Sequence, residues 1–193
     1  MPTAALLLAG GMSTRMGTDK ASLPFEGRRL VEVMNERLKG IPGISAVYIS
    51  GRVRGLPSIP DEHPRRGPLE GVRSVINELE RRGEGFAQFL IVPVDMPNLS
   101  TDQLGTLLGT SLGSSQAVYF SGFELPLLLR NCEEVRLQVN KLCCKERPAH
   151  ERSFRQLLAH LRVHQLPVAN SAGEVPKGFL NTNTPEEWKR ALL

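Results

Sequence analysis

The stretch AALLLAGGMSTRMGTDK, residues 4–20, joins an apolar run to a glycine-rich segment that carries two cations. An apolar run without polar alternation predicts a strand that is covered on both faces, as in a parallel sheet. Glycines let consecutive backbone N–H groups turn toward an anion without a Cβ in the way, and Arg15 and Lys20 add full positive charge. The stretch therefore predicts a buried strand followed by a loop that binds a polyphosphate.

Neither of the common phosphate-loop patterns matches this loop. A Walker loop requires Gly-Lys followed by Ser or Thr, whereas Lys20 is followed by Ala21. A dinucleotide-binding loop requires Gly-x-Gly-x-x-Gly, whereas Gly10 and Gly11 are adjacent.

Short apolar runs alternate with helical patterns along the chain. The apolar runs predict strands at residues 4–9, 46–50, 89–94, 117–120, 125–129 and 163–166. Apolar residues at helical spacing predict helices at residues 30–38, 68–82, 104–112, 154–161 and 185–193. Capping boxes support two helix starts, Ser100 with Gln103 and Thr184 with Glu187. Residues 130–152 are charged and weakly periodic, and they carry no assignment.

The alternation of strand and helix predicts an α/β fold with three layers, a mainly parallel sheet with helices on both faces, in a Rossmann-like arrangement. A length of 193 residues fits one domain over residues 1–193. The segment AALLLAGG lacks a basic leader and runs directly into the charged loop, so it is interpreted as a strand and not as a signal peptide.

Composition narrows the classes of partner. No apolar run reaches the roughly 18 residues that a membrane span needs. The net charge is +4, but the basic residues are scattered and aromatic residues make up only 5% of the chain, which disfavours nucleic-acid binding. The three cysteines form no C-x-x-C pair, so a reducing cytoplasm is the expected location. The charge is better suited to small anionic substrates.

A second informative segment is IVPVDMPNL, residues 91–99. The predicted strand ends at Val94 and delivers Asp95 to the carboxyl edge of the sheet, where ligands bind in open α/β folds. Mg²⁺ is usually held by one or two carboxylates together with substrate phosphates. Beside a phosphate-binding loop, Asp95 is therefore a candidate magnesium ligand, and the alternative is an aspartate that ends a strand in a turn.

A third candidate is Asp61, which precedes the segment RRGPLEG at residues 65–71. The Gly-Pro pair predicts a turn into an amphipathic helix. Contact with the nucleotide sugar, assistance to the metal and capping of the loop remain open as roles for Asp61.

Taken in order, the motifs form a pattern that covers nearly the whole chain. They are LAGGMSTRMGTDK (8–20), LPFEG (23–27), PD (60–61), RRGPLEG (65–71), PVDMP (93–97) and NTNTPEE (181–187). This pattern resembles the molybdenum cofactor guanylyltransferase family, within the nucleotidyltransferase superfamily that activates sugars and cofactors. The adjacent Gly10 and Gly11 resemble the glycine pair of the guanylyltransferases, whereas the related cytidylyltransferases look like they carry Ala in place of the first Gly. The pair therefore favours GTP over CTP.

The resemblance implies a Mg²⁺-dependent transfer of GMP from GTP to the terminal phosphate of molybdenum-molybdopterin, with release of pyrophosphate. It implies a catalytic role for Arg15, Lys20 and Asp95, magnesium binding by Asp95, and acceptor binding by Asn181 and Asn183. At position 50 this chain has Ser where the family often has Asn. The nucleotide-binding positions that the resemblance implies are Leu8, Ala9, Gly10, Gly11, Arg15, Lys20, Ser50, Asp61 and Asp95. It also implies molybdoenzymes or their chaperones as recipients of the product.

Two alternatives stay open at this point. One is a related nucleotidyltransferase that uses CTP or another phosphorylated acceptor. The other is a carrier of the cofactor without catalytic activity.

Overall fold

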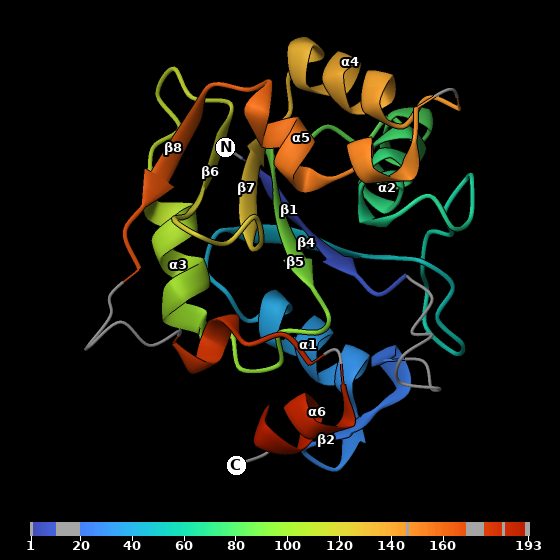
Figure 1. The fold of residues 1–193 in the computed structure, drawn as a ribbon, viewed down its shortest axis with the longest axis vertical. Coiled ribbons are helices and arrows are strands. Elements are labelled where there is room, and N and C mark those ends of the chain that lie inside the picture. Colours follow the sequence, from blue (N-terminus) through green and yellow to red (C-terminus); the bar gives the residue numbers. More distant parts are fainter. Residues whose placement is uncertain (1, 11–19, 146, 169–175, 183, 192–193) are drawn as a thin grey trace.

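A computed structural model describes residues 2–10, 20–145, 147–168, 176–182 and 184–191 (Figure 1). Its centre is a six-stranded sheet in the order β4-β1-β5-β7-β6-β8. In chain order these strands are β1 (Thr3–Leu8), β4 (Ile44–Ser50), β5 (Gln88–Pro93), β6 (Ala117–Phe120), β7 (Leu127–Arg130) and β8 (Val163–Leu166). A separate short hairpin is formed by β2 (Pro24–Phe25) and β3 (Arg28–Arg29).

The strand pairing confirms the prediction of a mainly parallel sheet. β1 lies between β4 and β5 and runs parallel to both, and β6 runs parallel to β8. Only β7 is reversed, because it pairs antiparallel with β5 and with β6.

Helices cover both faces of the sheet, as the sequence predicts (Figure 1). They are α1 (Leu30–Lys39), α2 (Pro68–Arg81), α3 (Thr101–Gly109), α4 (Glu133–Leu142), α5 (Phe154–Ala159) and α6 (Pro185–Ala191). Alternate residues of β1 enter two separate apolar clusters: Ala5 and Leu7 pack with α1 and α3, whereas Ala4 and Leu6 pack with α2, α4 and α5. Among the described residues, no helix is long and apolar enough to cross a membrane.

Both predicted capping boxes are present. Ser100 Oγ accepts from the Gln103 N–H at 3.1 Å, and Thr184 Oγ1 accepts from the Glu187 N–H at 3.1 Å. The first box starts α3 at Thr101, as the predicted N-cap Ser100 indicates and three residues before the apolar periodicity begins.

Other boundaries differ from the sequence prediction. The unassigned residues 130–152 contain α4, whose buried Val135, Val139 and Leu142 lie on one face. The strand expected at 125–129 is observed at Leu127–Arg130, and the hairpin of β2 and β3 has no counterpart in the prediction.

The ends of β1 and β4 touch through their backbones. The Ala9 N–H donates to the Ser50 carbonyl oxygen at 3.0 Å, which continues the parallel pairing beyond β1. Gly51 has a φ of +102°, and a Cβ at this position would lie 2.5 Å from Gly10 Cα. Because backbone atoms cannot move aside easily, only glycine fits at position 51.

We expect Gly51→Ala to destabilise the protein more than Gly43→Ala. Both glycines have positive φ values, +102° and +93°, so both variants carry the strain of an L-residue there, roughly 1 kcal/mol. At Gly43 a new Cβ meets nothing within 4 Å, whereas at Gly51 it also collides with Gly10. Thermal unfolding should show a loss of about 3 °C for Gly43→Ala and at least about 6 °C for Gly51→Ala. Equal losses would contradict the collision.

Candidate active site

The carboxyl ends of β1, β4 and β5 meet at one edge of the sheet. Leu8 is in register with Ser50 on one side and with Pro93 on the other. The Val94 N–H donates to the Leu8 carbonyl oxygen at 3.0 Å, so the chain that leaves β5 stays beside the chain that leaves β1. This is the edge at which open α/β sheets bind ligands.

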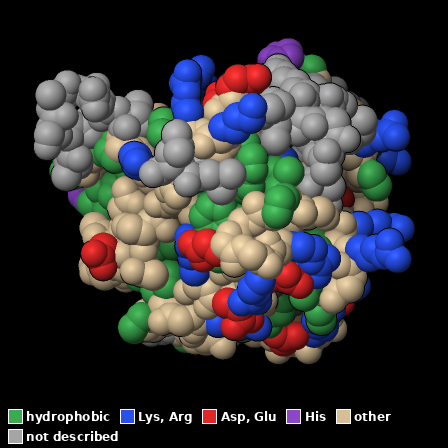
Figure 2. Space-filling model, turned by 90° about the horizontal axis from the view of Figure 1, so that it is seen from below, with side chains coloured by type: hydrophobic (Ala, Val, Ile, Leu, Met, Phe, Trp, Pro, Cys, Tyr) green, Lys and Arg blue, Asp and Glu red, His purple; other side chains and the backbone are tan. Residues whose placement is uncertain are grey.

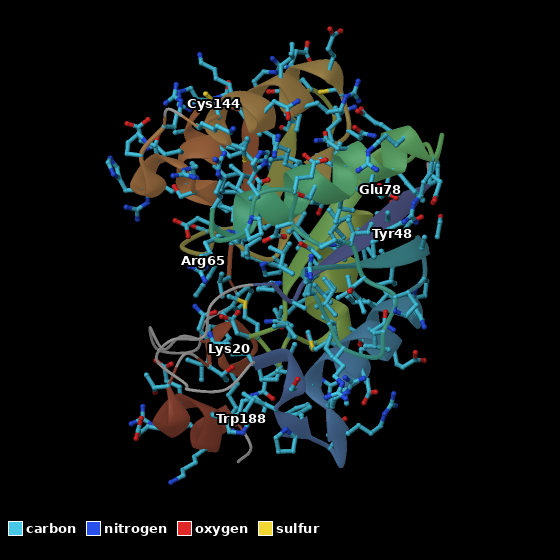
Figure 3. All side chains as sticks on the ribbon, turned by 90° about the vertical axis from the view of Figure 1, so that its right-hand side faces the viewer. Lys20, Tyr48, Arg65, Glu78, Cys144 and Trp188 are labelled. Carbon is cyan, nitrogen blue, oxygen red and sulfur yellow. The ribbon has the colours of Figure 1, made fainter. Side chains whose placement is uncertain are left out.

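An ion pair between Lys20 and Asp95 lies at this edge. Lys20 Nζ donates to Asp95 Oδ2 at 3.0 Å, although the two residues are 75 positions apart. Their side chains are 16% and 24% exposed, so the pair is only partly buried. Figure 3 shows Lys20 below the central ribbons, on the side of the molecule that carries Trp188 of α6.

The main chain of Asp95 is held by a residue that the sequence analysis missed. Thr182 is fully buried, and both its N–H (2.9 Å) and its Oγ1 (3.1 Å) donate to the Asp95 carbonyl oxygen. Thr182 lies in the NTNTPEE motif, in which the sequence analysis singled out the two asparagines and not the threonine. Asn181, the residue before Thr182, is exposed and is held near the Asp95 main chain by these bonds.

A second carboxylate, Asp61, faces the start of the glycine-rich segment. A Cβ at Gly10 would lie 3.6 Å from Asp61 Oδ2 and 3.1 Å from Gly51 Cα. On the other side of Asp61, a Cβ at Gly71 would lie 3.4 Å from Asp61 Oδ1 and 2.3 Å from Ser50 Oγ. The structure therefore groups Gly10, Ser50 and Asp61, three of the predicted nucleotide-binding positions.

The Asp61 carboxyl is poorly solvated. Its Oδ1 is buried and has no hydrogen-bond partner within the described parts of the chain. Burial raises the pKa of Asp61, the negative charge of Glu70 raises it further, and the Ser50 hydroxyl acts in the opposite direction. A buried acceptor without a donor is costly for the fold, so Asp61 is kept at this place at some cost in stability.

The remaining predicted positions divide into two groups. Leu8 is the last residue of β1, Ala9 follows it directly, and both are buried. Gly11, Arg15 and Asn183 lie outside the described residues. The roles given to all of these positions stay predictions.

The donor set at the strand ends fits a divalent cation. Asp95 offers a partly exposed carboxylate beside the predicted phosphate-binding segment, and Mg²⁺ takes its other ligands from phosphates and water. A different group of ligand atoms, from Glu62, His63 and Glu70, also converges within 4.8 Å. There, however, Arg73 Nη2 lies 2.6 Å from both His63 Nδ1 and Glu70 Oε1, so a guanidinium already holds the centre.

The charges on the surface are mixed in sign. On the face seen in Figure 2, basic side chains lie next to acidic ones and do not gather into one patch. Ion pairs such as Arg37 with Glu26 and Lys39 with Glu36 have this character.

A mainly parallel sheet whose strand ends bring together a glycine backbone, a lysine and two carboxylates defines a nucleotidyltransferase fold. Solved structures agree with this class. Molybdopterin-guanine dinucleotide biosynthesis protein A from Archaeoglobus fulgidus superposes with a TM-score of 0.73 at 19% identity, over 97% of this chain and 96% of that one.

The sequence comparisons identify the family. The model of the MobA-like NTP transferase domain matches residues 5–167. A molybdenum cofactor guanylyltransferase from Xanthomonas euvesicatoria is 39% identical over 191 residues, which cover 99% of this chain and 95% of the relative. A probable molybdenum cofactor guanylyltransferase from Bacillus cytotoxicus is 31% identical over 201 residues, 98% and 96% of the two chains. The chain belongs to the MobA-like NTP transferase family, which confirms the resemblance seen in the sequence.

We expect Asp61→Asn to stabilise the free protein at pH 7. Because the folded pKa is raised, the folded state holds a proton more firmly than the unfolded chain, and stability falls as pH rises from the ordinary value of 3.8 through the folded pKa. Above that pH window the carboxyl is ionised in the folded state and carries the full cost of desolvation and of repulsion by Glu70. The neutral amide of Asn removes this cost. Thermal unfolding at pH 7 should show a gain of about 2 °C.

This gain should shrink as the pH approaches 3.8, where the wild-type carboxyl is also neutral. Asp102→Asn is the control, because Asp102 is exposed in the first turn of α3 and is favourably placed by the helix dipole. A loss of stability in Asp61→Asn at pH 7 would contradict the interpretation.

Proposed function

We propose that this chain transfers GMP from GTP to the terminal phosphate of molybdenum-molybdopterin and releases pyrophosphate. The names of its relatives support this substrate pair. The observation that carries the proposal is the Lys20–Asp95 ion pair at the carboxyl ends of β1 and β5. A cation and a carboxylate together at this edge support a site for Mg²⁺ and a triphosphate.

The reaction needs positioning and charge neutralisation and no covalent intermediate with the protein. A terminal phosphate oxygen of the acceptor attacks the α-phosphorus in line, a new P–O bond forms, and the bond to the bridging oxygen of the leaving pyrophosphate breaks. Asp95 would hold Mg²⁺, which supplies positive charge at the α-phosphate and the leaving group when bound. Lys20 exchanges its bond to Asp95 for contacts to the triphosphate and stabilises the negative charge that develops.

The nucleotide side of the site is proposed to include Asp61. Its carboxylate faces Gly10, and GTP offers donors to such a group: ribose hydroxyls and, on guanine, adjacent N1–H and N2 amino groups. Cytosine presents one exocyclic amino group and no neighbouring ring N–H, so a carboxylate in this place favours guanine. Close packing at Gly10, where a Cβ would be 3.1 Å from Gly51 Cα, supports close approach of the nucleotide to the backbone.

The acceptor is proposed to bind next to the NTNTPEE segment, through Asn181 and Asn183. The two hydrogen bonds from Thr182 to the Asp95 carbonyl oxygen support this, since they hold the segment against the proposed metal-binding residue. We also propose a cytoplasmic location and transfer of the product to molybdoenzymes or their chaperones. Among the described residues, Cys132 and Cys143 form no disulfide, which is compatible with a reducing compartment.

The decisive experiment measures pyrophosphate release with Mg²⁺, molybdenum-loaded molybdopterin, and either GTP or CTP. We expect release with GTP, and loss of release in Asp95→Ala. Release with CTP alone would move the assignment to a cytidylyltransferase, and binding of molybdopterin without release from either nucleotide would favour a carrier.

Lys20 is expected to contribute directly to turnover. Lys20→Ala should lower turnover by roughly 10²-fold, because it removes one electrostatic stabiliser of the transition state. Lys39→Ala is the matched control, since Lys39 is exposed on α1 and, within the described part of the chain, forms an ion pair with Glu36. Unimpaired pyrophosphate release by Lys20→Ala would remove this residue from the mechanism.

A further inference from the structure

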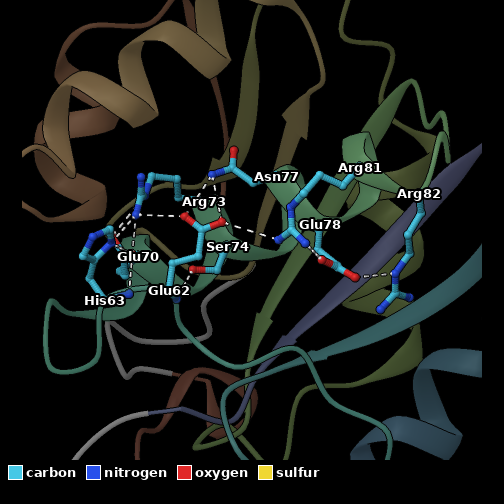
Figure 4. A network of polar contacts seen from close by, with 9 residues as sticks. All are labelled: Glu62, His63, Glu70, Arg73, Ser74, Asn77, Glu78, Arg81 and Arg82. Atoms are coloured by element: carbon cyan, nitrogen blue, oxygen red, sulfur yellow. Dashed lines mark hydrogen bonds and ion pairs between the residues drawn. The ribbon is translucent and has the colours of Figure 1, made fainter.

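A glutamate is fully buried in the first turn of α2 (Figure 4). Glu70 Oε1 accepts from the His63 backbone N–H at 3.1 Å and from Arg73 Nη2 at 2.6 Å. Glu70 Oε2 accepts from Arg73 Nε at 3.1 Å. A buried carboxylate is unfavourable unless it is paired, and this one is paired on both oxygens.

Residues of α2 also form hydrogen bonds to Glu62, the residue before His63. Ser74 Oγ accepts from the Glu62 backbone N–H at 2.9 Å. The Glu62 carboxylate lies 3.2 Å from Arg73 Nη2 and 3.2 Å from Asn77 Nδ2. Glu62 and His63 are therefore held against α2 through both backbone N–H groups and both side chains.

The geometry identifies this cluster as a clamp around a guanidinium and not as a metal site. Arginine can only donate, so the 2.6 Å contact from Arg73 Nη2 requires His63 Nδ1 to be an acceptor. Glu70 and His63 thus share the same arginine, whose positive charge would repel a metal ion.

Asp61 lies between this clamp and a second anchor. On the other side, the Ile59 N–H donates to the Ile49 carbonyl oxygen at 2.8 Å, and the Gly51 N–H donates to the Ile59 carbonyl oxygen at 2.8 Å. Asp61 Oδ1 itself has no hydrogen-bond partner in the part of the chain that the structure describes. Apart from the Ser50 hydroxyl, which lowers the pKa of Asp61, the direction of this carboxyl toward Gly10 is set by the chain on either side and by the first turn of α2.

We propose that Glu70 is a positioning residue for nucleotide binding, which holds the Asp61 carboxylate toward Gly10 by fastening residues 62 and 63 to α2. The inference rests on the proposed function, since it takes Asp61 as a contact to GTP. Glu70 does not act by favouring the charge of Asp61, because its own negative charge raises the pKa of that carboxyl. Its contribution is geometric.

The test substitutes Glu70→Gln and measures the Kd of Mg²⁺·GTP by calorimetry, together with KM and kcat for pyrophosphate release. The amide keeps the size of the side chain but loses the charged pairing with Arg73. We expect Kd and KM for GTP to rise about 10-fold, since a misplaced contact residue weakens binding, and kcat to change less than about 2-fold.

Glu78→Gln is the matched control. It is the same substitution in the same helix, on a glutamate that pairs with Arg81 and Arg82 near the end of α2. Figure 3 shows Glu78 well apart from Lys20. This variant should bind GTP as the wild type does.

A double substitution separates positioning from general support of the fold. If Glu70 acts through Asp61, Glu70→Gln should change the Kd less than about 2-fold in an Asp61→Asn background. Arg73→Lys keeps the positive charge but loses the forked contacts to Glu70. It should raise the Kd in the wild-type background and leave it nearly unchanged in the Asp61→Asn background, and it replaces Glu70→Gln in the test if that variant does not fold.

Equal effects of Glu70→Gln in both backgrounds would overturn the inference, because a merely structural residue weakens binding regardless of Asp61. Wild-type affinity in Glu70→Gln and Arg73→Lys would overturn it while leaving the proposed function intact. Failure of the wild type to bind Mg²⁺·GTP would instead overturn both.

Discussion

The backbone contact between Gly10 and Gly51 is the constraint on which the site depends. Parallel pairing brings the ends of β1 and β4 together, and the contact leaves no room for a Cβ at position 51. Since Ile59 is bonded to the same end of β4, the chain that carries Asp61 returns to the end of β1. A carboxylate from one loop therefore faces the backbone at which the glycine-rich segment begins.

The charges at this edge are unfavourable for the stability of the fold. Asp61 is desolvated, has no partner on Oδ1 among the described residues, and lies near the negative charge of Glu70. Replacement of a buried charged cluster by apolar residues is often neutral or stabilising, so stability alone does not explain Glu70 and Arg73. Glu70 contacts His63, and Arg73 contacts the side chains of Glu62 and His63. These contacts give an explanation in geometry, because they hold residues 62 and 63 against α2.

Local sequence signals were sufficient for part of this structure and not for the rest. The buried strand ahead of Gly10 and the strand that ends before Asp95 are apolar runs with clear boundaries, and both capping boxes are explicit. The helix α4 was missed because charged residues surround Val135, Val139 and Leu142 and its N-cap residue, Cys132, makes no side-chain cap. The reversed direction of β7 has no local signature, since an apolar strand reads the same in either direction. Burial of Glu70 depends on how residues 61–66 fold over α2, and a Glu-x-x-Arg spacing is equally typical of an exposed ion pair.

The Lys20–Asp95 pair is held by a scaffold of contacts between distant segments. Phe25, in the hairpin after Lys20, packs on Trp188 of α6 with ring centroids 5.9 Å apart. Arg37 stacks over Phe25 at 5.3 Å and donates to the Pro97 carbonyl oxygen at 2.6 Å, two residues beyond Asp95. Thr182, just before α6, bonds the Asp95 backbone. The segments proposed to contact the phosphates, the metal and the acceptor therefore share one set of supports, so a shift of α6 would move the acceptor side and the metal side of the site together.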